Sequence, residues 1–245
     1  MPHTSAKQPK QITVLGATGS VGESTLDLVG RSPHDYEVVA LTGNKNVARL
    51  AELALKHRAK LAVAANAASY KDLLLALAGT GIEVAAGPKA LLDAASRPAD
   101  WIMAAIVGVA GLRPTLRAVR QGTAVALANK ECLVSGGEIF MREVAAHGTT
   151  LLPVDSEHSA AMQARIGSEL DKIECVCLTA SGGPFRTWSA EQMASGGPVQ
   201  ALKPTSWNMG AKVTIDSASL MNKGLELIEA HHLFALPPEK LDVVV

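Results

Sequence analysis

Two carboxylates separated by one residue, Asp155 and Glu157, follow a strand-like run at residues 149–153. In an extended chain, residues i and i+2 point the same way, so both side chains can reach one cation. The run predicts a strand, and ligands of open α/β sheets bind beyond the carboxyl ends of strands. Carboxylates prefer hard cations and zinc-type clusters are absent, so we expect Mg²⁺ or Mn²⁺. Such pairs are also common on exposed loops.

A second polar set, Asn222, Lys223 and Glu226, has helical spacing. Residues three and four apart are neighbours on one helix face, so these side chains can act together. A Lys–Glu pair of this kind is usually a surface ion pair that contributes little. The hydroxyls of Ser217 and Ser219 come just before it. The combination is suited to binding a phosphate and completing a metal site.

A glycine-rich turn, Gly16-Ala17-Thr18-Gly19-Ser20-Val21-Gly22, joins a predicted strand to a predicted helix. Glycines at this spacing allow a tight turn and let backbone amides approach a pyrophosphate at the helix N-terminus. The second strand ends in Leu41-Thr42-Gly43-Asn44-Lys45-Asn46, without the acid that binds the ribose of NAD. Lys45 and the two asparagines can donate to a 2′-phosphate instead, which favours NADP over NAD. A solvated polar loop is the alternative interpretation of these residues, and it explains the set less well than any one of them.

Alternating strands and helices must position these residues. Repeated units of this kind predict an α/β fold with a doubly wound parallel sheet, Rossmann-like, over residues 1–153. A second, α/β or α+β domain is expected over residues 154–245, with a strand at 175–179 and one helix from about 217 to 234. The strands of the first domain are predicted at 11–15, 37–41, 61–64, 82–85, 101–107, 123–126 and 149–153.

The chain ends in an apolar, β-branched run at residues 241–245. A strand this apolar is expected to be buried on both faces and followed by further structure. We therefore expect the chain to be the front part of a longer protein whose catalytic domain is truncated here.

Composition narrows the classes of protein. The 245 residues carry 23 Lys and Arg against 23 Asp and Glu, so neither nucleic acid nor an anionic membrane would meet an attractive net field. Apolar stretches are too short to span a membrane. Three cysteines without a CxxC pair suit the reducing cytoplasm. These features predict a soluble, cytoplasmic protein whose main partner is neither nucleic acid nor a membrane.

Five strings occur in order along the chain: the GATGSVG turn, Ala126–Glu131 (ALANKE), Pro153–His158 (PVDSEH), Ser181–Arg186 (SGGPFR) and the stretch from Met209 through DSASLMNKGLE to Glu226. Together they resemble the 1-deoxy-D-xylulose 5-phosphate reductoisomerase family. The resemblance implies an NADPH- and metal-dependent enzyme of isoprenoid precursor biosynthesis that makes 2-C-methyl-D-erythritol 4-phosphate. It also implies a homodimer and a C-terminal helical domain, which we expect to be missing here.

The resemblance also assigns roles, residue by residue. Asp155, Glu157 and Glu226 would be the metal ligands, and Lys130 would act beside them on the substrate. The substrate would also contact Ser156, Ser181, Trp207, Ser217, Asn222 and Lys223, besides Glu157 and Glu226. The cofactor would contact Thr18, Gly19, Ser20, Val21, Gly43, Asn44, Lys45, Asn46, Asn129, Glu131 and Gly210.

The segment Trp207–Met209 would form a lid over the substrate and nicotinamide. The family's lid reads His-Pro-x-Trp, whereas this chain has Lys203-Pro204-Thr205-Ser206-Trp207, so an imidazole that binds substrate is missing. Lys203 can offer a phosphate only a flexible point charge.

Two other readings remain open. One is an NADPH-binding module without turnover, because the catalytic half is cut. The other is a different NADP-dependent sugar or semialdehyde dehydrogenase, which would not need the three carboxylates.

Overall fold

A computed structural model describes residues 8–167, 169–203 and 210–245. The chain forms two compact units, Met1–Val154 and Asp155–Val245, and each is described by itself below. The domain division expected from the sequence lay one residue earlier, after residue 153.

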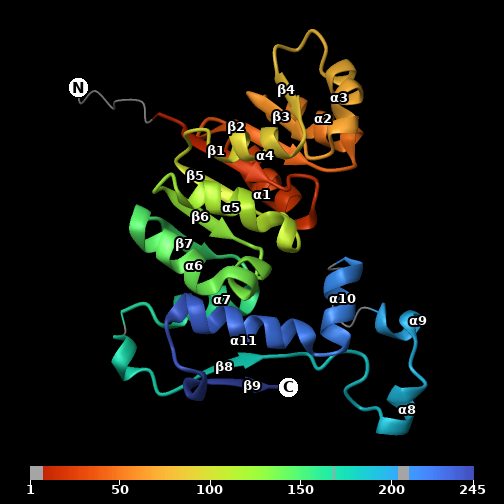
Figure 1. The fold of residues 1–245 in the computed structure, drawn as a ribbon, viewed down its shortest axis with the longest axis vertical. Coiled ribbons are helices and arrows are strands. Elements are labelled where there is room, and N and C mark those ends of the chain that lie inside the picture. The colour runs from red at the N-terminus through yellow and green to blue at the C-terminus, as the bar shows by residue number, and fades with distance from the viewer. Residues whose placement is uncertain (1–7, 168, 204–209) are drawn as a thin grey trace. The chain divides into compact units, whose positions relative to one another are not determined.

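Seven parallel strands form the sheet of the first unit (Figure 1). Their order is β4-β3-β2-β1-β5-β6-β7, so the sheet grows outward in both directions from β1. This confirms the predicted doubly wound α/β fold. The strands are β1 (Lys10–Leu15), β2 (Tyr36–Gly43), β3 (Leu61–Ala64), β4 (Glu83–Ala86), β5 (Trp101–Ala104), β6 (Ala124–Leu127) and β7 (Thr150–Pro153).

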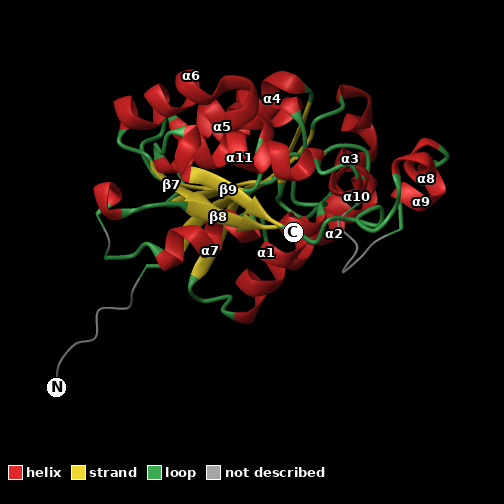
Figure 2. Cartoon of the chain, turned by 90° about the horizontal axis from the view of Figure 1, so that it is seen from below, coloured by secondary structure: helices red, strands yellow, loops and turns green. Residues whose placement is uncertain are grey.

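Helices cover both faces of this sheet, as its continuously apolar strands require (Figure 2). Buried side chains of the first three helices share one core with Ile12, Val14 and Leu41. Residues of β2 and β3 that point to the opposite face pack with Ala94 of the fourth helix. The helices are α1 (Ser20–Arg31), α2 (Val47–Lys56), α3 (Tyr70–Ala76), α4 (Pro88–Ala95), α5 (Leu112–Val119) and α6 (Glu131–His147), with short 3₁₀ turns at Ala67–Ser69 and Val109–Gly111.

The strand predicted at residues 101–107 ends earlier, at Ala104. The backbone of the next residues leaves the sheet, because the carbonyl oxygens of Ile106 and Gly108 accept hydrogen bonds from the side chain of Asn129. Gly108 has a φ of +76°, which turns the chain away from the strand direction.

The second unit has a two-stranded parallel sheet covered by helices. Leu178 of the first strand packs with Ala230 and Phe234 of the longest helix, and Ala161 and Met162 join this cluster. The elements are α7 (Ser156–Ala164), a 3₁₀ turn (Leu170–Lys172), β8 (Val176–Thr179), α8 (Ala190–Ala194), α9 (Pro198–Ala201), α10 (Ala211–Ala218), α11 (Met221–Phe234), a 3₁₀ turn (Pro238–Lys240) and β9 (Leu241–Val244).

Two expectations for this unit are wrong. The single helix predicted from about 217 to 234 is broken at Leu220, whose φ of +61° no α-helix accommodates. The terminal strand pairs with β8, but Asp242 and Val244 are exposed. α11 packs against only one face of β9, so the residues of β9 alternate between half-buried and exposed positions. The strand is therefore not buried on both faces, contrary to the expectation from the sequence.

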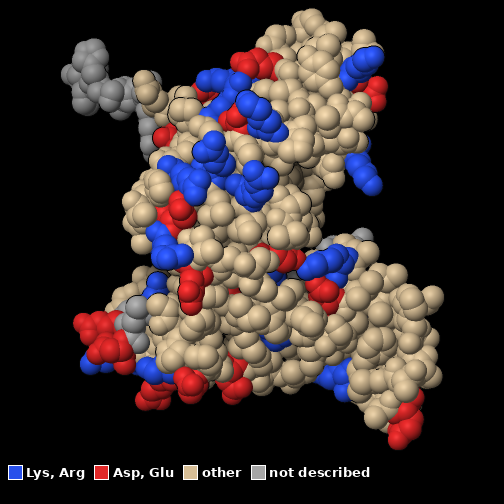
Figure 3. All heavy atoms as spheres, in the orientation of Figure 1, with Lys and Arg blue, Asp and Glu red and all other residues tan. Residues whose placement is uncertain are grey.

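Charged side chains of both signs are scattered over the face of the first unit that Figure 3 shows. Several basic groups of α4–α6 and their connections form local ion pairs, such as Arg97 with Glu83 and Arg120 with Glu143 at 2.6 Å. Among the helices of the described ranges, none is long and apolar enough to cross a membrane.

Candidate metal centre and nucleotide-binding edge

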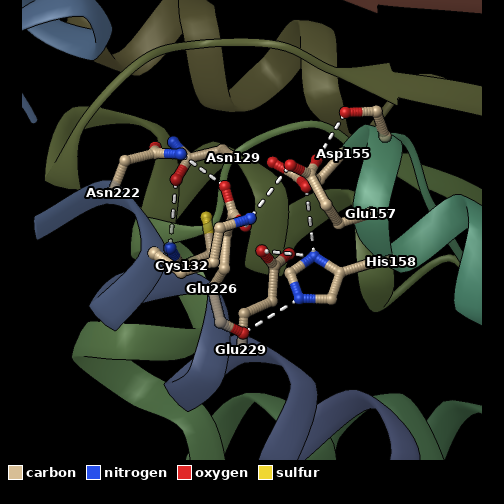
Figure 4. A network of polar contacts seen from close by, with 10 residues as sticks. Asn129, Cys132, Asp155, Glu157, His158, Asn222, Glu226 and Glu229 are labelled. Carbon is tan, nitrogen blue, oxygen red and sulfur yellow. Dashed lines mark hydrogen bonds and ion pairs between the residues drawn. The ribbon is translucent and has the colours of Figure 1, made fainter. Parts of the chain in front are cut away.

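Three carboxylates meet in the second unit. Ligand oxygens of Asp155, Glu157 and Glu226 all lie within 4.8 Å of one another (Figure 4). Asp155 is the N-cap of α7, Glu157 belongs to the first turn of that helix, and Glu226 comes from α11. The extended geometry used to predict the Asp155–Glu157 pair is wrong, because the helix begins between them. Carboxylate oxygens gathered in this way fit a hard divalent cation.

Lys223 joins two of these carboxylates. Its ammonium nitrogen lies 2.9 Å from Oε1 of Glu157 and also contacts Oε2 of Glu226. Asn222 donates to the other oxygen of Glu226. Burial by itself raises the pKa of Glu157, but hydrogen bonds from Ser156 and Lys223 and the lysine's charge outweigh it and lower the pKa to about 2. Glu157 is therefore held as a carboxylate.

Behind the cluster lies a fully buried pair, His158 and Glu229. The Nδ1 atom of His158 lies 3.1 Å from Oε2 of Glu229 and 3.5 Å from Oδ1 of Asp155. Burial lowers the pKa of His158, but the hydrogen bond and charge of Glu229, with Asp155, more than offset it and raise the pKa above its ordinary value. An imidazolium at this place compensates part of the charge of the buried Glu229 and the half-buried Asp155.

The sequence interpretation missed these two residues. A usable signal was present, because His158 follows Asp155 by three positions and Glu229 follows Glu226 by three. Residues three positions apart are neighbours on one face of a helix, so His158 is expected next to Asp155 and Glu229 next to Glu226.

Of the expected substrate residues of the second unit that the structure describes, Ser156 and Glu157 begin α7, and the others lie on α10, on α11 and on the turn after β8. Asn222 and Lys223 open α11, and Ser217 is in the last turn of α10. Ser181 follows β8, and its hydroxyl accepts a hydrogen bond from the amide of Gly183 at 3.3 Å. A Cβ on Gly183 would lie 2.7 Å from the carbonyl oxygen of Ser217, so the turn after β8 lies directly against the end of α10.

Two further expected residues come from the stretch before α10: Trp207 for the substrate and Gly210 for the cofactor. Trp207, with the rest of the expected lid at 207–209, lies outside the described residues. Gly210 is the N-cap of α10, with a φ of +86°.

In the first unit, the glycine-rich turn lies between the ends of β1 and β5, where the strand order reverses. Gly16 has a φ of +86°, and a Cβ there would lie 2.6 Å from the carbonyl oxygen of Ala105. A Cβ on Gly22 would lie 2.3 Å from the carbonyl oxygen of Gly16. This close packing brings the N-terminus of α1, capped by Gly19, to the switch point at which nucleotides bind in such sheets.

The other expected cofactor residues of this edge border the turn. A Cβ on Gly43 would lie 3.3 Å from the side-chain methyl carbon of Thr18, so the end of β2 faces the glycine-rich turn. Ser20 and Val21 begin α1. The loop residues Asn44 and Lys45 are exposed, and Asn46 caps α2 by accepting from the amide of Arg49 at 3.1 Å.

Asn129 also has a structural role, apart from the expected contact with a cofactor. Its buried side chain donates to the carbonyl oxygens of Ile106 and Gly108. It also accepts from the amide of Cys132 at 3.0 Å, and Figure 4 shows these two residues side by side. It thereby fixes the loop after β5 to the start of α6. Lys130, which is buried, and Glu131, which is half-buried, follow it at that helix start.

The sheet order and the glycine turn at its switch point define an α/β protein of the doubly wound, Rossmann-like class. A family model described as 1-deoxy-D-xylulose 5-phosphate reductoisomerase matches residues 12–137, and one for the C-terminal domain of the same enzyme matches 151–234. The chain belongs to the 1-deoxy-D-xylulose 5-phosphate reductoisomerase family.

Relatives of that name are similar over nearly the whole chain. Those of Rhodospirillum centenum and Zymomonas mobilis are 56% and 55% identical, over 96% and 97% of this chain but 59% and 61% of their own length. The chain thus spans about three-fifths of the curated relatives it matches.

Solved structures agree with this assignment. The Zymomonas mobilis reductoisomerase in complex with NADPH is 52% identical with a TM-score of 0.89, covering 96% of this chain and 61% of that one. A reductoisomerase in complex with NADPH, fosmidomycin and magnesium is 39% identical with a TM-score of 0.88, covering 96% and 60%.

Proposed function

We propose that the protein takes part in the NADPH- and metal-dependent conversion of 1-deoxy-D-xylulose 5-phosphate to 2-C-methyl-D-erythritol 4-phosphate, in the cytoplasmic supply of isoprenoid precursors. The cluster of Asp155, Glu157 and Glu226 beside Lys223 carries this proposal. It offers a hard cation three carboxylates and, next to them, groups suited to a phosphate. Another NADP-dependent dehydrogenase would not need this set.

In this proposal the first unit binds NADPH. The amides of the glycine-rich turn and of the start of α1 would hold the pyrophosphate, and Asn44, Lys45 and Asn46 would receive the 2′-phosphate. Asn129, Glu131 and Gly210 would contact the cofactor further along, and Asn129 also holds the loop after β5. The cramped position of Gly16 supports this assignment, because it brings the backbone rather than a side chain to the switch point.

The second unit would bind Mg²⁺ or Mn²⁺ and the substrate. Asp155, Glu157 and Glu226 would hold the cation, and Ser156, Ser181, Ser217, Asn222 and Lys223 would bind the substrate's hydroxyls and phosphate. When bound, the cation would polarise the substrate's carbonyl oxygen and NADPH would supply the hydride. Lys130 would stabilise negative charge that develops on the substrate. The Trp207 segment would exclude water, and two chains would form a homodimer.

The test is NADPH oxidation, followed by absorbance, with 1-deoxy-D-xylulose 5-phosphate and with or without Mn²⁺. Oxidation that requires Mn²⁺ is the expected result, and Glu226→Gln should abolish it. NADPH binding without turnover would instead favour the cofactor-binding module. Oxidation that a chelator leaves unchanged would rule out the carboxylate site.

A further inference from the structure

The ammonium of Lys223 lies among the oxygens that the proposed function assigns to a cation. It contacts Oε1 of Glu157 at 2.9 Å and Oε2 of Glu226, two of the three candidate ligands. The side chain of Lys223 is only 8% exposed, and that of Glu226 is 1% exposed. Little water is available to screen these charges, so the contacts are strong.

A divalent cation and an ammonium compete for the same lone pairs. The carboxylates of Asp155, Glu157 and Glu226 bring three negative charges within 4.8 Å. Lys223 compensates one of them, whereas a divalent cation would compensate two. Once the divalent cation is bound, its double positive charge would repel the ammonium of Lys223 at short range.

Lys223 can leave the cluster without unfolding its helix. Four rotatable carbon–carbon bonds separate its charge from the backbone, and it stands in the first turn of α11. Glu226 meanwhile keeps the hydrogen bond that Asn222 donates to Oε1. The carboxylate of Glu226 would stay oriented while the ammonium moves.

We propose that Lys223 is an exchangeable internal counter-ion. It holds Glu157 and Glu226 until a divalent cation binds, the cation displaces it, and the released ammonium then receives the phosphate of the substrate. This inference rests on the proposed function and adds a coupling to it. By thermodynamic linkage, cation and phosphate each strengthen the binding of the other through one side chain.

The first test follows the reactivity of Lys223 in the unaltered chain. Reductive methylation with mass spectrometry should label it slowly in EDTA and at least about fivefold faster in saturating Mg²⁺. Lys212 is an internal reference, because it pairs with Asp216 at 2.8 Å on α10 and is 45% exposed. Its labelling should not change with Mg²⁺. Equal labelling of Lys223 with and without Mg²⁺, under conditions where the metal is bound, would overturn the exchange.

The second test measures Mn²⁺ affinity from the electron paramagnetic resonance signal of the free ion. Lys223→Met should bind Mn²⁺ about tenfold more tightly than the unaltered chain, because no ammonium competes. Lys212→Met should match the unaltered chain, and Glu226→Gln should lose binding. Unchanged or weaker binding by Lys223→Met, with binding lost in Glu226→Gln, would overturn the exchange and leave the metal site standing. No Mn²⁺ binding by the unaltered chain would overturn both.

Discussion

The Nε2 atom of His158 donates a hydrogen bond to the backbone carbonyl oxygen of Glu226 at 2.9 Å. A carbonyl can only accept, so this contact fixes the proton on Nε2. The other ring nitrogen then faces Glu229 and Asp155. One buried imidazole thus connects the N-cap of α7 to the turn of α11 that carries Glu226.

We expect this connection to make stability depend on pH. The pKa of His158 is raised in the folded chain, so its contribution is fully present below the unfolded value of about 6.5. The contribution is lost as the pH rises through the folded pKa. Urea unfolding of the unaltered chain and His158→Gln in EDTA should show a stability difference that shrinks above pH 6.5. A difference that grows with pH would contradict this.

Removing the buried partner tests the same pair from the other side. Glu229→Gln leaves the imidazole without its nearest charge, so we expect a loss of about 3 kcal/mol in the free energy of unfolding near pH 6. Glu239→Gln is a suitable control, because it changes the same residue type in an exposed 3₁₀ turn. A loss no larger than that of the control would refute the role of Glu229.

Acid should act through Glu157. Its pKa is lowered to about 2, so its contribution is present above the ordinary value of 4.5 and lost as the pH falls toward 2. The stability difference between the unaltered chain and Lys223→Met should therefore shrink over this range, as followed by circular dichroism. Lys240→Met, which removes a donor to the carbonyl oxygen of Ile173, is the control. Its free energy of unfolding should differ from that of the unaltered chain by the same amount at every pH in this range.

A methyl group at Gly16 should disrupt the switch point. Gly16→Ala would meet the carbonyl of Ala105 and a strained φ, so we expect a loss of about 3 kcal/mol or more. Gly79→Ala has a similar φ of +75°, but its Cβ would meet no described atom within 4 Å, so about 1 kcal/mol is expected. Equal losses in urea unfolding would show that the close approach is unimportant.

Asn129→Ala should loosen the loop after β5. It leaves the carbonyl oxygens of Ile106 and Gly108 without their donor, at about 1–3 kcal/mol for each buried group. Amide hydrogen exchange over residues 105–111 should become faster and NADPH binding weaker. Asn66→Ala, which removes an exposed cap, is the control and should leave that exchange unchanged. Slow exchange in Asn129→Ala would exclude the proposed holding role.

The sheet was predictable because its strands are buried on both faces. Runs such as Val38–Leu41 and residues 61–64 are continuously apolar, and glycine and helical segments separate them, so local pattern and tertiary environment agree. The helix break at Leu220 was not predictable from the sequence, because leucine favours helices and nothing in the local sequence indicates a positive φ at this position.

The three carboxylates of the metal site were predicted from sequence motifs, but most of the side chains that contact them were not. Lys223 pairs with Glu157, 66 positions away, and His158 with Glu226, 68 positions away. Such partners emerge only when α7 and α11 pack together. For the same reason, helix spacing alone described Lys223 and Glu226 as neighbours without showing that Glu157 shares the ammonium.

The central position of β1 has a consequence for synthesis on the ribosome. β1 is made first, yet one of its two neighbours is β5, with Ile12 beside Trp101. At roughly 5–20 residues per second, about 90 residues take about 5–20 seconds to follow. During that time one edge of β1, four of whose six residues are buried in the folded sheet, has no partner, and such edges promote aggregation. The nascent chain is therefore expected to depend on chaperones most strongly before β5 emerges.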